Sequence, residues 1–306
     1  MIACDCPTCT SDDPRDRRTR TGAAVQWVDP QGQPRTVLID CGPDIRQQAI
    51  REGLWRCDAI LFTHNHVDHI FGLDEVRRFN AVMKAPLNIY AEDYVLESLR
   101  RVYRHIFDRD ANTNDSFVAT LIPNRIVPPA AEGGTLAALE LWGLRFEPIR
   151  LMHGRLPILG WRIEEIPRLH AGREGGSPFP LAYCTDVSAI PTGAWRRLTG
   201  LRTLALDGLR FRRHPTHFSL DQAIDASLRI AADQTYFIHI AHEIRHAEVD
   251  PSLPEGIHLA YDGLALGDGD AELFREHGRL NSHLRPAPIA DQQAGVEQAQ
   301  ARFDED

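Results

Sequence analysis

The sequence predicts an α/β protein in which stacked β-sheets are covered by helices. Nine short apolar or β-branched runs have the length of strands, and each ends in Gly, Pro, Asp or a polar cluster. Between several of these runs lie segments whose apolar residues recur at helical spacing. The 306 residues are 43% hydrophobic and 25% charged, and no apolar run reaches the ~18 residues of a membrane span. These observations are typical of a soluble globular domain.

Each expected element rests on its own run of residues. The predicted strands are 23–28, 36–40, 59–62, 87–90, 144–149, 181–184, 203–206, 235–240 and 258–260. The apolar stripes of the predicted helices are Ile70, Leu73 and Val76; Val95, Leu99, Val102 and Ile106; and Leu220, Ile224 and Leu228. Strands in groups with helices between them favour one α/β domain, which we expect over residues 1–266.

Two segments are expected to lie outside this regular structure. Residues 112–134 are rich in Asn, Pro and Gly and are expected to form a long connection. Residues 267–306 are polar, with Gln repeats and acidic ends, and are expected to form a mobile tail.

The charge distribution excludes some partners. Lys and Arg number 34 against 43 Asp and Glu, which gives 34 − 43 = −9. Residues 268–306 carry nine acidic residues and four arginines, or −5, so the body of the chain carries only −4. A nearly neutral body argues against general binding to a phosphate backbone. No basic start followed by an apolar stretch marks the chain for export, so we expect a cytoplasmic protein.

A dense cluster of metal-ligand residues follows the predicted strand 59–62. His64, His66, Asp68 and His69 stand within six positions, with the first two after the strand and the others in the first turn of a helix. Imidazole and carboxylate are ligands for zinc, manganese or iron, and this many of them leaves room for two ions. The alternative is a surface loop that is rich in histidine by chance.

Three further candidates stand at the ends of later strands. His153, Asp186 and His239 each follow an apolar run, at the carboxyl end of the strand where open sheets collect functional groups. Alone, each is more often a surface or core residue. The cluster at 64–69 is what makes them candidate ligands.

Several longer phrases accompany these residues. They are 4–9 (CDCPTC), 13–18 (DPRDRR), 38–44 (LIDCGPD), 214–218 (HPTHF), 239–243 (HIAHE), 253–256 (LPEG) and 260–263 (AYDG). With the histidine cluster they resemble the metallo-β-lactamase superfamily, and most closely its phosphodiesterases that accompany the carbon–phosphorus lyase pathway. The likeness extends in order over residues 3 to 265.

The resemblance implies a fold, a ligand set and a role for one further histidine. The fold is an αββα sandwich with metals at one edge. The implied ligands are His64, His66 and His153 for one ion, Asp68, His69 and His239 for the other, with Asp186 bridging them. The resemblance also implies that His217 acts on the substrate rather than on metal. Members normally begin with a strand and a Gly-rich loop, whereas three residues precede Cys4 here. Two alternatives stay open: the start of the chain was placed too far downstream, or the protein lacks that edge element.

Three of the six cysteines are crowded together at the start of the chain. Cys4, Cys6 and Cys9 place three sulfurs within reach of one centre, and in a reducing cytoplasm thiolate coordination of zinc is favoured over a disulfide. The family resemblance indicates His242 as the fourth ligand of a structural zinc. The alternative is three free or buried thiols. The remaining cysteines are expected to be small core residues: Cys41, Cys57 and Cys184.

A short basic run lies between residues 15 and 20. Its arginines could meet a phosphate, but a solvated turn in which they pair with the neighbouring aspartates is favoured.

The chemistry we expect is metal-dependent hydrolysis of a phosphodiester. Two divalent ions, zinc or manganese, would lower the pKa of a water and neutralise charge on the phosphate oxygens. Asp68 would supply an anionic ligand, and His217 would be a general acid or a donor to the phosphate. By resemblance the substrate is a small cyclic phosphodiester such as a phosphoribosyl cyclic phosphate.

Three alternatives stay open. One is another hydrolase of the superfamily such as a tRNA 3′-end nuclease, although we see no basic arm to grip RNA. The others are a non-catalytic metal-binding module and a structural protein in which the cysteine zinc is the only metal. We expect a small-molecule partner, neither a membrane nor a nucleic acid, and leave a homodimer open.

Overall fold

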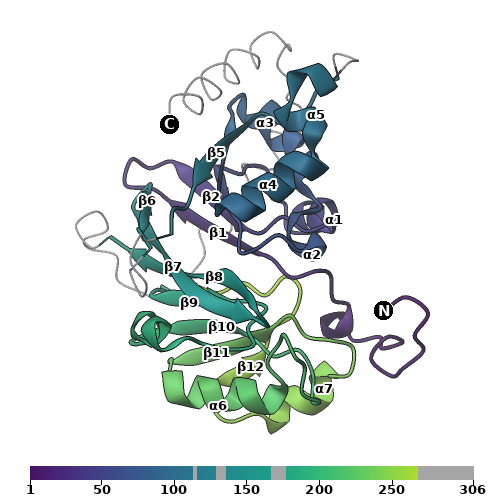
Figure 1. Ribbon diagram of the computed structural model, residues 1–306. Coiled ribbons are helices and arrows are strands. Elements are labelled where there is room, and N and C mark those ends of the chain that lie inside the picture. Colours follow the sequence, from purple (N-terminus) through teal and green to yellow (C-terminus); the bar gives the residue numbers. More distant parts are fainter. Residues whose placement is uncertain (113–115, 129–135, 167–176, 268–306) are drawn as a thin grey trace. The chain divides into compact units, whose positions relative to one another are not determined.

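The structure is a computed structural model that describes residues 1–112, 116–128, 136–166 and 177–267. The tail expected at 267–306 therefore lies almost wholly outside the described residues. The chain forms two compact units. We call residues 22–128 the five-strand unit, and residues 1–21 with 136–267 the seven-strand unit; Figure 1 labels their elements.

The five-strand unit is a mostly parallel sheet with helices packed on it. Its strands are β1 (Ala23–Val28), β2 (Pro34–Ile39), β3 (Ala59–Leu61), β4 (Leu87–Ala91) and β5 (Leu121–Arg125), in that spatial order. Its helices are α1 (Ile45–Arg51), α2 (Val67–Ile70), α3 (Arg77–Met83), α4 (Asp93–Val102) and α5 (Arg104–Phe107). β1 pairs with β2 in antiparallel fashion, and the other neighbours are parallel. Ile60 and Ile89 of the strands share one buried cluster with Leu73 and Leu99 of the helical segments.

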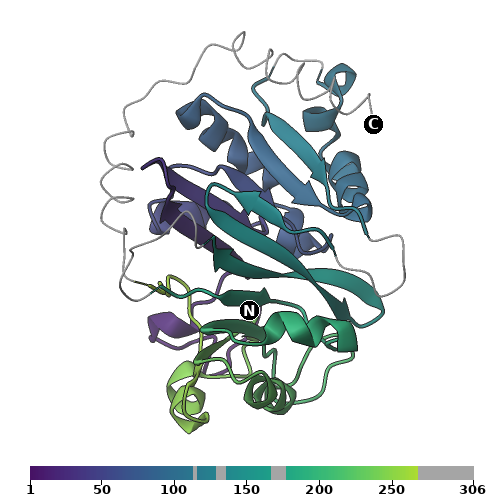
Figure 2. The ribbon, with the colours of Figure 1, turned by 90° about the vertical axis from the view of Figure 1, so that its left-hand side faces the viewer.

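The seven-strand unit carries the longer sheet. Its strands are β6 (Leu139–Leu141), β7 (Leu144–His153), β8 (Leu156–Glu165), β9 (Leu181–Cys184), β10 (Thr203–Asp207), β11 (Gln234–Ile238) and β12 (Ile257–Leu259), in the spatial order β12-β11-β10-β9-β8-β7-β6. Its α-helices are α6 (Leu220–Ile230) and α7 (His246–Val249). In Figure 2 the green helices of this unit lie on one side of its sheet. Leu206 and Phe237 of the strands share a buried cluster with Ala223 and Ile230 of α6.

Strand direction in this second sheet gathers several strand ends at one edge. β9, β10, β11 and β12 are parallel to one another. β8 runs antiparallel to both β7 and β9, so β7 points the same way as β9. The carboxyl ends of β7, β9, β10 and β11 therefore meet at the same edge, which is where open sheets collect functional groups.

The described residues also contain short 3₁₀ helices. These are η1 (Pro14–Asp16), η2 (Leu73–Val76), η3 (Arg109–Ala111), η4 (Thr192–Leu198) and η5 (Asp250–Ser252). The stripe expected at Ile70, Leu73 and Val76 is thus divided between α2 and η2. No helix in the described part of the chain has the length and apolarity needed to cross a bilayer.

Three strands and two side chains differ from expectation. β5, β6 and β8 were not predicted, and β5 lies inside the segment expected to be a connection. Leu228 and Val102 were placed on buried stripes but are 59% and 39% exposed. In α6 the buried stripe consists of Leu220, Ala223, Ser227 and Ile230. Because this buried face contains the small residues Ala223 and Ser227, the sequence made it look less apolar than the adjacent face of the helix that was predicted to be buried.

Candidate metal centre

The predicted histidine cluster forms within the five-strand unit. β3 ends at Leu61, and His64 follows two residues later, while Asp68 and His69 lie in α2. The centre of the His64 ring lies 4.6 Å from the centre of the His66 ring and 4.2 Å from the centre of the His69 ring. Asp68 Oδ1 lies 3.9 Å from His69 Nε2. A strand end, a short loop and the first turn of a helix thus place all four predicted ligands together.

A buried carboxylate fixes the orientation of two of these rings. Asp40 accepts hydrogen bonds from the backbone N–H of Thr63 (2.8 Å) and from its hydroxyl (2.8 Å), and it contacts His69 Nδ1 at 2.7 Å. Because the Thr63 hydroxyl donates to Asp40, it accepts from His64 Nδ1, 2.9 Å away. Both rings therefore carry their proton on Nδ1, and Nε2 is the nitrogen available to a metal. Sequence reasoning gave Asp40 no role.

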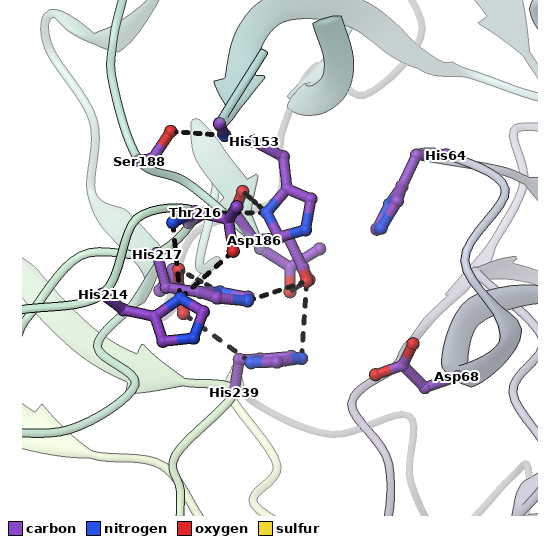
Figure 3. A network of polar contacts seen from close by, with 12 residues as sticks. His64, Asp68, His153, Asp186, Ser188, His214, Thr216, His217 and His239 are labelled. Carbon is purple, nitrogen blue, oxygen red and sulfur yellow. Dashed lines mark hydrogen bonds and ion pairs between the residues drawn. The ribbon is translucent and has the colours of Figure 1, made fainter. Parts of the chain in front are cut away.

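The seven-strand unit holds a second set of candidate ligands. His153 ends β7, and Asp186 and His239 follow β9 and β11, so the three residues share the sheet edge described above (Figure 3). His239 Nε2 lies 3.5 Å from Asp186 Oδ1. One ligand atom each from His153, Asp186 and His217 lies within 4.8 Å of the others. The strand-end rule therefore selected residues that do come together.

His153 is oriented by two backbone carbonyls. Its Nδ1 lies 2.7 Å from the carbonyl oxygen of Thr216 and 3.0 Å from that of Asp186. Carbonyls only accept, so Nδ1 carries the proton and Nε2 is left to bind a metal. Gly154 allows this approach: its φ is +63°, and a Cβ there would lie 2.8 Å from Thr216 Cγ2.

A histidine–carboxylate pair stands beside these ligands. His217 Nδ1 lies 2.9 Å from Asp207 Oδ2, and the His217 ring stacks on His239 at 4.9 Å with an interplanar angle of 13° (Figure 3). Asp207 ends β10 and is fully buried. Burial raises the pKa of the Asp207 carboxyl above its ordinary value. The hydrogen bond with His217 lowers this pKa and so offsets part of the effect of burial. Sequence reasoning missed Asp207, although the same strand-end rule that selected Asp186 would have found it.

Three of these residues have left-handed backbone conformations. Asp40, Asp186 and His239 have φ values of 64°, 57° and 56°. Each directly or closely follows a strand, where the chain turns sharply. A residue other than Gly in such a conformation costs of order 1–3 kcal/mol, and residues of this kind concentrate at functional sites.

The cysteine motif forms a separate four-residue cluster. One ligand atom each from Cys4, Cys6, Cys9 and His242 lies within 4.8 Å of the others. His242 Nδ1 lies 3.4 Å from Cys4 Sγ and 3.3 Å from Cys6 Sγ, close to the edge of about 3.6 Å expected between sulfur and nitrogen in tetrahedral zinc coordination. The hydrogen bond with His242 lowers the pKa of the Cys6 thiol to about 6. A thiolate is the form that binds zinc, so the donor set fits a closed structural site.

The basic run after the cysteines is mainly a paired turn. Arg15 bonds to Asp13, and Arg18 bonds to Asp16 at 3.1 Å, so the expected pairing forms, but the Arg18–Asp16 pair is largely buried rather than solvated. Arg18 also donates to the carbonyl oxygen of Ala241 at 3.0 Å. Through Arg18, the basic run is anchored to the segment next to His242. Arg15 and Arg18 are already paired with aspartates, so not all arginines of the run are available to bind a phosphate.

Comparison with known proteins identifies the family. A family described as "Beta-lactamase superfamily domain" matches residues 35–240, which span both units. A crystal structure described as a new diphosphatase from the PhnP family shares 37% identity, with a TM-score of 0.71, over 86% of this chain and 89% of that chain. The short form of human tRNase Z, at 19% identity and a TM-score of 0.57 over 80% and 92% of the two chains, has the same fold.

A relative in Porphyromonas gingivalis (strain ATCC BAA-308 / W83), named octanoyltransferase, is 34% identical over 265 residues. The match covers 86% of this chain but 48% of that protein, so the chain spans about half the length of this relative. The α/β class and the superfamily expected from the motifs are confirmed. With its strand-end ligands and its matches in both units, the chain belongs to the metallo-β-lactamase superfamily of metal-dependent hydrolases, close to its PhnP family.

Proposed function

We propose that the protein hydrolyses a small phosphodiester, of which a phosphoribosyl cyclic phosphate is the example that its motifs suggest. The single observation that carries this proposal is the His217–Asp207 pair at the same sheet edge as the ligands Asp186 and His239. A site that only bound metal would not need a polarised histidine beside its ligands. The 37% identity to a diphosphatase supports chemistry at phosphorus.

The two ligand sets would hold two divalent ions, zinc or manganese. Their donor atoms fit: imidazole nitrogens whose Nδ1 protons are already engaged, and carboxylates that balance the charge of the ions. When bound, such ions neutralise charge on phosphate oxygens and lower the pKa of an attacking water. Asp68 and Asp186 would supply the anionic ligands.

His217 would protonate the leaving alkoxide. Its Nδ1–H donates to Asp207, which orients the ring and leaves Nε2 as the atom that can reach substrate. The buried carboxylate also lies where it can balance the positive charge of a doubly protonated ring. Transfer of the Nε2 proton to the departing oxygen completes cleavage of the P–O bond.

A pair of chromogenic substrates tests the proposal. Purified protein loaded with zinc or manganese is expected to hydrolyse bis(p-nitrophenyl) phosphate far better than p-nitrophenyl phosphate, because a site for diesters has no place for a dianionic monoester. The measurement is kcat/KM for both compounds, with a β-lactam and a thioester as controls. Activity on either control with none on any diester would refute the proposed function.

A further inference from the structure

A further histidine, His214, stands beside the proposed acid in the seven-strand unit. The centre of the His214 ring lies 5.0 Å from that of His217, and the His217 ring in turn stacks on His239 (Figure 3). His214 is half-buried, and the next residue along the chain is exposed. The metal-dependent hydrolysis proposed above gives this imidazole no role.

The loop that carries His214 is fixed by hydrogen bonds at its start. The carbonyl oxygen of Leu209 accepts from the N–H of Ala241 at 2.8 Å. That of Arg210 accepts from the N–H of Leu220, also at 2.8 Å. The Arg210 guanidinium donates to the carbonyl oxygens two and three residues further along, each at 3.3 Å. His214 therefore stands on a backbone whose conformation is set before any substrate binds.

Thr216 determines which nitrogen of His214 carries the proton. The Thr216 backbone N–H donates to His214 Nδ1 at 3.3 Å, and the Thr216 hydroxyl lies 3.1 Å from the same nitrogen. Because Nδ1 accepts, the neutral ring carries its proton on Nε2. Within the part of the chain that the structure describes, no residue accepts a hydrogen bond from that N–H. The Nε2–H donor is therefore available to a bound molecule.

His214 and His217 have different electrostatic surroundings. The pKa of His214 lies below its ordinary value, because burial disfavours the charged ring and because positive charge on His217 and Arg210 adds to this effect. His217 instead bonds at 2.9 Å to the buried carboxylate of Asp207, whose negative charge can balance a protonated ring. His214 is thus suited to stay a neutral donor while His217 transfers a proton.

We infer that His214 is a further catalytic residue, whose Nε2–H donates to a non-bridging oxygen of the phosphate group that is cleaved. This inference rests on the proposed function and deepens it, since His217 would act on the leaving oxygen and His214 on the charge of the phosphoryl group. Oxygens bonded to one phosphorus lie closer together than two rings whose centres are 5.0 Å apart, so both histidines can contact one phosphate. A donor that is already in position stabilises the transition state without reorganisation.

Two amide substitutions test the donor with little change in polarity. The amide nitrogen of His214→Gln reaches close to the position of Nε2, so this variant keeps a donor to the phosphate. His214→Asn keeps an acceptor for the Thr216 N–H but is too short to supply that donor. For the metal-loaded protein and ethyl p-nitrophenyl phosphate, we expect kcat/KM to fall about 10- to 100-fold in His214→Asn and to stay within about threefold of native in His214→Gln.

A chiral thio-substituted diester tests the contact itself. The two enantiomers of ethyl p-nitrophenyl phosphorothioate place sulfur at one or the other non-bridging position, and sulfur is a weak hydrogen-bond acceptor. For one enantiomer the native protein loses a contact that His214→Asn has already lost. The ratio of kcat/KM for the oxygen compound to that for this enantiomer should therefore be about tenfold smaller in His214→Asn than in the native protein. For the other enantiomer the ratio should be the same in both proteins.

Controls separate this role from a structural effect. His105→Asn removes a surface histidine that pairs with Asp74 in the five-strand unit, and it should change neither kcat/KM nor the oxygen-to-sulfur ratio. Both His214 variants should keep the native metal content by elemental analysis and a nearly native Tm. Loss of metal or of folded protein from both variants would assign His214 a structural role instead.

The possible failures are distinguishable. If His214→Asn and His214→Gln are equally active, or if the oxygen-to-sulfur ratio of His214→Asn matches the native ratio for both enantiomers, His214 does not contact the phosphate although the diesterase exists. If the native protein cleaves neither ethyl p-nitrophenyl phosphate nor bis(p-nitrophenyl) phosphate, the proposed function fails and the role of His214 with it.

Discussion

Single side chains divide the proposed chemistry between metal binding and proton transfer. His64, His69 and His153 each have Nδ1 engaged by an oxygen, which leaves Nε2 for an ion. His217 has the same arrangement with Asp207, yet the resemblance assigns it to substrate. Geometry alone does not separate these roles, because one ligand atom of His217 also lies within 4.8 Å of those of His153 and Asp186.

Metal analysis of two variants separates the roles. Asp68→Ala removes a ligand, so both the bound metal and the rate should fall. His217→Ala removes an acid, so metal content should stay intact while kcat falls by roughly two to four powers of ten. The measurements are elemental analysis and diester kinetics on the same preparations. An ion lost from His217→Ala would show that His217 is itself a ligand.

The candidate metal ligands were easier to predict than the residues that orient them. The cluster His64, His66, Asp68 and His69 can be recognised from sequence alone, since four ligand residues in six positions are rare by chance. Asp40 and Asp207 are single carboxylates at strand ends, and their value lies in one hydrogen bond each to a distant histidine. The strand-end rule could have listed both carboxylates as candidates, but which histidine each one contacts depends on the tertiary fold, which local sequence does not contain.

At the scale of elements, the hairpin between β7 and β8 determines where His153 lies. Gly154→Ala would place a methyl group 2.8 Å from Thr216 in a backbone conformation with φ of +63°. We expect a loss of about 1–3 kcal/mol in the free energy of unfolding, from conformational strain and overpacking. Activity should fall as well, because Thr216 also accepts from His153.

Denaturant unfolding and diester kinetics measure both effects. Gly193→Ala is the matched control, since a Cβ at Gly193 meets nothing within 4 Å. If the two variants have equal free energies of unfolding, the loop at Thr216 can move to accommodate the added methyl group without loss of stability.

The cysteine segment is expected to be tied to the fold by zinc. Cys6→Ser should lower the zinc content by one ion per chain and lower Tm, because the binding energy of a closed site appears as folding stability. The folded fraction should keep its other metals and much of its diesterase activity. Cys184→Ala removes a fully buried thiol and should lower Tm without loss of zinc. Unchanged zinc and Tm in Cys6→Ser would return these cysteines to the alternative of free thiols.

Two of the three strands missed by sequence analysis, β5 and β8, share a physical reason. β5 contains Pro123 and Asn124, which resemble turn signals, but β5 is an edge strand, where the missing proline N–H costs nothing. β8 contains Gly160, a position where a Cβ would lie 2.7 Å from Leu151 Cδ1, so close packing requires the glycine there. In both strands the breaker residue is explained by position in the sheet, which is known only after the fold.

For the whole molecule, metal content distinguishes the enzyme from its alternatives. Native protein should hold about three ions per chain, whereas a structural protein with only the cysteine site would hold one. Chelation should abolish diester hydrolysis and lower Tm, and zinc or manganese should restore both; an ion present at 100 times its Kd contributes about 2.7 kcal/mol to stability. Full activity after complete metal removal would exclude the proposed mechanism.

The left-handed backbone at Asp40, Asp186 and His239 has an evolutionary consequence. Glycine would adopt these conformations without steric cost, so the fold would be relieved of strain if the functional side chains were lost. Selection for stability alone would therefore erode this site, and only selection for its chemistry can preserve it. A descendant that abandoned catalysis would be expected to drift toward glycine first at these three turns.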